Sequence, residues 1–127
     1  MTPHAEELAI SEVAERTGLT VHTLRYYERA GLMLAPIQRA SSSHRAYTVR
    51  DVTWIVFLTK LRSTSLPIKK VREYAELARR GDGTRADRLE LLQRHRITVA
   101  AQLAQMQASL AAIDHKISLY SDRSPSA

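Results

Sequence analysis

A short stretch near the N-terminus carries most of the residues that could recognise a polyanion. From Thr20 to Gly31 the sequence reads TVHTLRYYERAG, which offers hydroxyls, an imidazole, two guanidiniums and two phenols. Such donors contact phosphate oxygens, and side chains that enter the major groove read base edges. This stretch therefore predicts nucleic-acid binding. Its candidate DNA-binding residues are Thr20, His22, Thr23, Arg25, Tyr26 and Tyr27.

The same stretch has the punctuation of one short helix. Thr20 suits the N-cap, because its hydroxyl can accept a bond from an N–H of the first turn. Gly31 suits the left-handed residue that commonly ends a helix. Val21, Leu24 and Tyr27 recur at every third position and form a narrow apolar side, so the polar residues face outward.

A second short helix is predicted directly before it. Ser11 is the expected cap of a segment running from Glu12 to Thr17, and Gly18 is the expected stop. Two short helices with a tight turn between them form a helix-turn-helix, whose second helix enters the major groove. A helical hairpin in another small α domain would give the same pattern, so the motif alone leaves both interpretations open.

Several short motifs resemble the opening of MerR-type transcription regulators. They are ISEVA at 10–14, Gly18, TLRYYE at 23–28, Gly31-Leu32, Arg45-Ala46-Tyr47, Asp51-Val52 and Leu61-Arg62. The resemblance covers residues 9–80 in sequence and continues to Tyr120 in architecture. It implies a winged helix-turn-helix followed by a long helix that forms an antiparallel coiled coil with a second copy.

Charge agrees with an acidic partner. The 127-residue chain has a net charge of +6 and a sequence pI of about 10.1. Residues 16–62 hold eight lysines and arginines against only Glu28 and Asp51. The chain has no cysteine, which excludes disulfides, thiolate metal sites and thiol chemistry. No apolar run reaches membrane-spanning length and no signal peptide is recognisable, so we expect a cytoplasmic protein with no membrane partner.

The segment after the first two helices is predicted to be a β-hairpin wing. Pro36 excludes a helix there, a polar tip follows at 38–44, and Arg45 to Tyr47 form the returning strand. Arg39 and Arg45 are expected to reach phosphate, as is Tyr47 of the Arg-x-Tyr motif. The resemblance usually places a glycine at the tip, where this chain has serines and His44.

Two core helices are predicted next. Thr48 with Asp51 marks the start of a helix from Val49 to Ser63, which is apolar around most of its circumference. We assign Trp54 and Phe57 to packing. The resemblance assigns Arg62 to DNA phosphates. After a turn at 64–67, a helix is expected over 68–80, with Tyr74 in the core.

A second organising element begins after Gly81-Asp82-Gly83, where Thr84 and Asp87 are expected to restart the helix. Apolar residues then alternate in steps of three and four up to Tyr120, which predicts a coiled-coil seam. No other helix of the chain matches it in length, so the expected partner is another copy. The predicted dimer-interface residues are Leu89, Leu92, Val99, Leu103, Met106, Leu110, Ile113, Ile117 and Tyr120, and Arg96 is the polar interruption.

The predicted fold class is all-α with a small β-hairpin wing. Residues 1–8 are expected to form a flexible arm and residues 9–80 the winged helix-turn-helix domain. The dimerisation helix covers 84–120, and 121–127 is the expected flexible tail. At about 1.5 Å per residue this helix spans roughly 55 Å.

The predicted function is a sequence-specific transcription regulator that binds a palindromic promoter operator as a homodimer. Half-sites about two turns apart would suit the long helix. The resemblance adds that the dimer distorts the promoter for RNA polymerase. An architectural, excisionase-like DNA-binding protein is the alternative. No nucleophile–base pair, phosphate loop or metal-spaced cluster appears, so we expect no enzyme activity, no cofactor and no metal.

The signal is the least defined feature of the sequence. Residues 54–63 and Gly81-Asp82 look most like the aldehyde- and nitrosative-stress branch of the family, many of whose members have a cysteine where this chain has Lys60. A thiolate cannot be the detector here. We assign Lys60 to the surface or to phosphate, and expect any effector to be a non-covalent small molecule.

Overall fold

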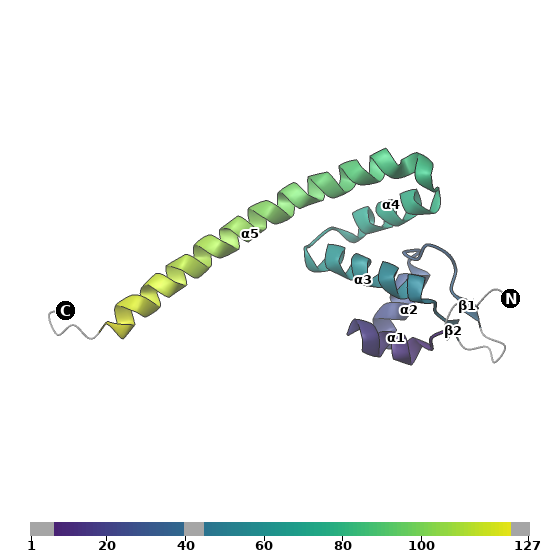
Figure 1. Ribbon diagram of the computed structural model, residues 1–127, viewed down its shortest axis with the longest axis horizontal. Coiled ribbons are helices and arrows are strands. Elements are labelled where there is room, and N and C mark those ends of the chain that lie inside the picture. Colours follow the sequence, from purple (N-terminus) through teal and green to yellow (C-terminus); the bar gives the residue numbers. More distant parts are fainter. Residues whose placement is uncertain (1–6, 40–44, 123–127) are drawn as a thin grey trace. The chain divides into compact units, whose positions relative to one another are not determined.

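The computed structural model describes residues 7–39 and 45–122, with the backbone alone at Gln38, Arg39 and Arg45. The chain divides into two compact units, residues 1–91 and 92–127. Its elements are α1 (Ile10–Thr17), α2 (Val21–Arg29), β1 (Gln38–Arg39), β2 (Arg45–Ala46), α3 (Val49–Ser63), α4 (Ile68–Arg79), the 3-10 turn η1 (Asp82–Thr84) and α5 (Arg85–Ser121) (Figure 1). The fold is mostly helical, as predicted.

α1 and α2 form the predicted helix-turn-helix. Gly18 is left-handed, with φ of +74°, and its N–H donates to the Ala14 carbonyl oxygen at 3.0 Å. Thr20 caps α2 by accepting a bond of 3.0 Å from the Thr23 amide. Gly31, with φ of +72°, follows the last turn of α2. These three positions confirm the predicted stops and cap, because each needs only its local backbone geometry.

The start of the first helix differs from the prediction. α1 begins at Ile10, and the backbone oxygen of Ala9 accepts bonds from the amides of Glu12 and Val13, both at 3.0 Å. Ala9 is the N-cap and provides no side-chain bond. Ser11 therefore lies inside the first turn and is not the cap.

Leu8 was predicted to belong to a flexible arm, and this prediction is wrong. Its side chain is only 2% exposed. Its amide donates to the Tyr47 carbonyl oxygen at 2.7 Å and its carbonyl oxygen accepts from the Tyr47 amide at 2.9 Å. A buried leucine held by two backbone bonds belongs to the folded domain. The rest of the predicted arm, apart from Glu7, lies outside the described residues.

β1 and β2 pair antiparallel over two positions, Gln38 opposite Ala46 and Arg39 opposite Arg45. The polar tip at 40–44, including His44, lies outside the described residues. Two residues per strand are too few to establish a wing as an element of the architecture. The predicted hairpin is therefore reduced to this short pair, and the helices define the fold.

α3 occupies the bounds that the sequence predicted. Thr48 and Asp51 form a reciprocal capping box, in which the Asp51 amide donates to Thr48 Oγ1 at 3.1 Å and the Thr48 amide donates to Asp51 Oδ2 at 2.9 Å. Ile55, Leu58 and Leu61 of α3 are buried. Other core side chains come from α1, α2, α4 and the loops: Val13, Leu24, Leu32, Leu66 and Val71.

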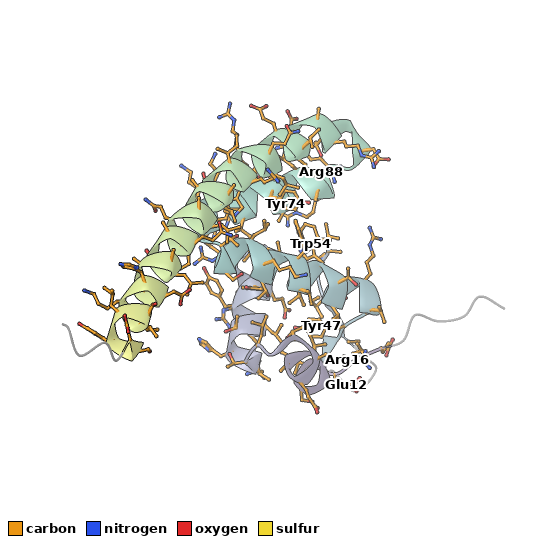
Figure 2. The ribbon with its side chains drawn as sticks, turned by 60° about the vertical axis from the view of Figure 1, so that its left-hand side comes forward. Glu12, Arg16, Tyr47, Trp54, Tyr74 and Arg88 are labelled. Atoms are coloured by element: carbon orange, nitrogen blue, oxygen red, sulfur yellow. The ribbon has the colours of Figure 1, made fainter. Side chains whose placement is uncertain are left out.

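The predicted packing role of the aromatic residues is confirmed. The Trp54 and Tyr74 rings stack, with centroids 5.7 Å apart and planes 10° apart (Figure 2). Phe57 packs against the same tyrosine, with centroids 5.8 Å apart. Trp54 Nε1 donates to the Leu32 carbonyl oxygen at 2.7 Å, which joins α3 to the segment after α2. Burial raises the pKa of Tyr74, and the positive charge of Arg88 opposes this shift.

Thr84 was expected to restart the long helix as its cap, and the structure corrects this. Its hydroxyl donates to the carbonyl oxygens of Leu77 (2.6 Å) and Gly81 (2.8 Å), so it closes the end of α4 instead. Arg88 Nε donates back to Thr84 Oγ1 at 3.1 Å. These bonds join the first turn of α5 to the end of α4.

α5 contains no buried residue along its whole length. In the unit formed by residues 92–127, the large apolar side chains of the described part are exposed or half-buried. A helix that exposes this much apolar surface lacks its packing partner within the described part of the chain.

Replacing Thr48 with alanine removes the hydroxyl that satisfies the Asp51 amide. We expect the free energy of unfolding to fall by about 1 kcal/mol, measured by urea denaturation followed by circular dichroism. Thr53→Ala is the matched control, because the Thr53 hydroxyl donates to the Val49 carbonyl oxygen and frees no backbone N–H when it is lost. Equal losses in the two variants would contradict the capping role.

Candidate nucleic-acid interface

The outward face of α2 presents the predicted contact residues together. His22, Arg25 and Arg29 are exposed, and Tyr26 is 40% exposed. Thr23 is half-buried, and its hydroxyl accepts a bond of 3.0 Å from the Thr20 hydroxyl. The cap thus holds Thr20 and Thr23 in place at the N-terminal end of α2, beside His22. A helix N-terminus of this kind attracts phosphate through its dipole and its free N–H groups.

The opposite face of α2 is buried. Leu24 is 1% exposed and Tyr27 is 6% exposed. The apolar side that the sequence predicted therefore packs into the core and fixes which residues point outward. Tyr27 was also predicted to bind DNA, but its burial argues against a direct contact, because almost none of its surface remains accessible.

Tyr47 shows the same conflict. It was predicted to engage phosphate, yet its side chain is only 1% exposed and its backbone bridges to Leu8. Its ring is a core residue, which argues against direct DNA contact through this side chain. Arg39 and Arg45 face each other in the strand pair, and their side chains lie outside the described residues.

Arg62 lies at the end of α3 with its side chain exposed. Its Nη1 donates to the Leu66 carbonyl oxygen at 2.7 Å and so braces the turn between α3 and α4. Ser65 in that turn has φ of +72°, which is an uncommon conformation for a residue with a side chain. A guanidinium has five N–H donors, so others remain available for phosphate.

The C-terminal end of α2 and the segment after it accept bonds from two arginines of α4 that the sequence analysis did not single out. Arg72 Nε donates to the Ala30 carbonyl oxygen at 3.1 Å. Arg79 Nη1 donates to the carbonyl oxygens of Gly31 (2.8 Å) and Met33 (2.7 Å). Ala30 is the C-cap of α2, where carbonyls lack intrahelical partners and cations are stabilising. Gly31 and Met33 lie just beyond the helix. We call Arg72 and Arg79 the α4 clamp.

No local signal could have identified the α4 clamp. Its residues are more than 40 positions from the carbonyls that they contact, and α4 reads as an ordinary helix with mixed surface charge. The spacing of Arg72 and Arg79, seven residues apart, does place them on one face. That spacing is compatible with many surface helices, so it carries little information by itself.

Other kinds of site are not apparent in the part of the chain that the structure describes. Within it, no three His, Asp or Glu side chains gather as metal ligands would. Its helices also include none with the length and apolar character that crossing a membrane requires.

Comparison with known proteins agrees with this geometry. Residues 8–77 match the MerR HTH family regulatory proteins, and residues 52–116 match the family described as MerR, DNA binding. The chain belongs to the MerR family. The chain is therefore a DNA-binding transcription regulator, as predicted.

Individual relatives agree. An uncharacterized HTH-type transcriptional regulator of Haemophilus influenzae is 30% identical over 87% of this chain and 81% of its own length. The regulator AdhR of Bacillus subtilis is 42% identical over 65% of this chain, a match that spans 59% of AdhR. HiNmlR, a MerR family regulator lacking the sensor domain and solved bound to promoter DNA, superposes with a TM-score of 0.82 at 28% identity, covering 91% of each chain.

Replacing Arg79 with methionine keeps the aliphatic stem of the side chain and removes its bonds to the Gly31 and Met33 carbonyl oxygens, in the segment that follows α2. We expect the free energy of unfolding to fall by about 1 kcal/mol, measured by urea denaturation. Arg80→Met is the matched control, because within the described residues the Arg80 side chain pairs with Glu76, one turn away on the exposed surface of α4. If both variants lose the same stability, Arg79 does not hold the segment after α2.

Proposed function

We propose that this MerR-family regulator binds a palindromic promoter operator as a homodimer, with α2 in the major groove and α5 as the dimerisation helix. The observation that carries this proposal is that one chain presents two separate surfaces suited to binding. One is the exposed, basic face of α2, and the other is the unpartnered apolar stripe of α5.

The contacts divide by their position on the domain. His22 and Thr23, in the first turn of α2, lie nearest to base edges and supply sequence discrimination, supported by the cap at Thr20. Arg25 and Tyr26 are exposed one turn further along and engage phosphate. Arg62 adds a phosphate contact from the end of α3.

The assignment of Arg39 and Arg45 to phosphate is kept in this proposal. The antiparallel pairing of β1 with β2 supports it, since it brings Arg39 and Arg45 opposite each other. Two arginine positions that are paired across strands can serve one stretch of phosphate backbone. Tyr47 is best assigned to anchoring the segment in the core.

The stripe on α5 suits a second copy of the same helix. Leu103, Leu110, Ile113 and Ile117 are each more than half exposed, and Tyr120 is 80% exposed. These side chains occupy the predicted a and d positions of a coiled coil, where pairing removes them from water. By resemblance the two helices run antiparallel.

The length of α5 sets the operator geometry in this proposal. Its 37 residues span roughly 55 Å at about 1.5 Å per residue, which exceeds the roughly 34 Å of one turn of DNA. Half-sites about two turns apart fit better. RNA polymerase is the expected partner on the same promoter, and bending or untwisting the DNA between the half-sites would realign the promoter elements at a cost of several kcal/mol, about 1–6 by elastic estimates.

Arg25→Ala removes a phosphate contact and His22→Ala a base contact. We expect Arg25→Ala to weaken binding to operator and random DNA alike and to reduce the slope of log K against log salt by about 1. His22→Ala should mainly reduce the preference for operator. Fluorescence anisotropy across a salt series distinguishes the two variants. Glu15→Ala is the control, because Glu15 is an exposed residue of α1. Wild-type affinity of Arg25→Ala at every salt concentration would exclude its role.

Leu103→Asp and Leu110→Asp place an unpaired carboxylate in the stripe of α5. We expect each to give monomers that have lost operator binding, because an isolated charge is strongly disfavoured in an apolar interface. Sedimentation velocity at micromolar concentration measures the state. Ala111→Asp, which adds the same charge outside the stripe, is the control. A wild-type protein that sediments as a monomer would refute the homodimer.

A further inference from the structure

The stripe of α5 contains one charged position, and the part of the helix after Leu91 contains one carboxylate. Arg96 interrupts the seam, and Asp114 is the only acidic residue between Leu91 and Ser121. Both are exposed. They lie roughly 27 Å apart along the axis, at about 1.5 Å per residue, so they cannot meet within one helix.

Neither residue has a partner of opposite charge in its own helix. Positions three and four away from Arg96 hold Leu92, Gln93, Val99 and Ala100, and the corresponding neighbours of Asp114 are Leu110, Ala111, Ile117 and Ser118. Ion pairs along a helix form at these spacings. An opposite charge for either residue must therefore come from another element.

Heptad positions show where that element would be. Leu89, Arg96, Leu103, Leu110 and Ile117 repeat every seven residues at position a, and Leu92, Val99, Met106, Ile113 and Tyr120 repeat at position d. Asp114 directly follows a d residue and occupies position e, at the edge of the seam. In an antiparallel pair each a residue faces a d residue of the partner, and the a and e positions of both helices share one side.

One antiparallel alignment uses every seam position. It places Leu89 opposite the partner's Tyr120, Leu103 opposite the partner's Met106 and Arg96 opposite the partner's Ile113. In this alignment Arg96 lies one residue from the level of the partner's Asp114, on the same side of the pair. Its long side chain can lie along the apolar layer while the guanidinium reaches the carboxylate at the edge.

Other alignments lose this match. A slide of one heptad in either direction leaves Arg96 beside the partner's Gln107 or the partner's Ser121, and it removes apolar layers from the ends of the seam. A parallel pair in register places Arg96 against the partner's Arg96, so that like charges meet between the helices. An unmatched charge next to apolar layers is strongly disfavoured.

We infer that Arg96 forms an ion pair with the partner's Asp114 and that this pair, made twice in the dimer, fixes its antiparallel orientation and register. The inference rests on the homodimer proposed above. The apolar layers supply most of the affinity, because they are the large exposed side chains of α5. The charged layer selects one alignment among those that the apolar repeat allows, in the way that single polar residues specify coiled-coil register.

Charge reversal tests the pair. Arg96→Glu alone and Asp114→Lys alone should each weaken dimerisation about tenfold, since each creates two like-charge contacts per dimer. The double variant Arg96→Glu/Asp114→Lys should recover the wild-type dissociation constant, measured by analytical ultracentrifugation of the full chain. Ala111→Lys, on the outer face of α5, is the control and should leave it unchanged. Wild-type affinity of Asp114→Lys, or a double variant as weak as Arg96→Glu, would overturn the inference.

Crosslinking tests the register independently. Because the chain has no cysteine, the introduced cysteines are its sole thiols. Leu92 faces the partner's Ile117 in the inferred alignment, whereas the two copies of position 92 would stand roughly 38 Å apart at about 1.5 Å per residue. A mixture of Leu92→Cys and Ile117→Cys chains should therefore crosslink through a short bis-maleimide, and neither variant alone should. Crosslinking of Leu92→Cys with itself would overturn the register and leave the homodimer standing. A monomeric wild-type chain would overturn both.

Discussion

The carbonyl groups at the C-terminal end of α2 impose a constraint on the whole DNA-binding unit. A helix of nine residues satisfies few of its own terminal groups, and such short helices are marginal in isolation. Here Thr20 caps the N-terminal end, and Arg72 of α4 donates to the C-cap carbonyl of Ala30. Arg79 of α4 holds the segment that follows. The order of the exposed face of α2 therefore depends on the packing of α4, a helix that is distant from it in the sequence.

α3 makes that long-range connection possible. Its inner face buries Ile55, Leu58 and Leu61, and its Trp54 bonds to the Leu32 carbonyl oxygen while stacking on Tyr74 of α4. The same aromatic cluster thus contacts both the segment that follows α2 and the helix that carries the α4 clamp. The recognition helix, the core helix and α4 behave as one packed body, within which the exposed residues of α2 keep fixed relative positions.

Sequence reasoning succeeded where a short-range rule decides the geometry. Gly18 and Gly31 stop helices because they tolerate positive φ, and the Thr48–Asp51 box starts α3 because both bonds close within one turn. It failed where a side chain bonded to another helix, and where two nearby residues could each serve as the N-cap. The Ser11 hydroxyl could cap a helix, but α1 already begins at Ile10 and its N-cap is Ala9. The Thr84 hydroxyl donates to the Leu77 carbonyl oxygen of α4 and does not cap an amide of α5.

The candidate site was predictable in the same uneven way. The identity of the outward residues of α2 followed from its apolar side, whereas the burial of Tyr27 and Tyr47 did not, because an aromatic hydroxyl reads equally as a core or a surface group. The α4 clamp was invisible, since its contacts span more than 40 residues. These failures concern tertiary contacts, which one sequence does not display.

The division of the chain into a folded N-terminal unit, the head, and an exposed helix affects how operator occupancy depends on the amount of protein. Residues 1–91 form a compact unit with a core of their own, so this unit does not depend on the stripe of α5 for its buried side chains. In the proposed homodimer, loss of pairing would then leave folded heads that each bind one half-site weakly. If an operator is held only by two heads together, its occupancy rises with the square of the chain concentration below the dimerisation constant. A modest change in synthesis of the chain would produce a steeper change at the promoter.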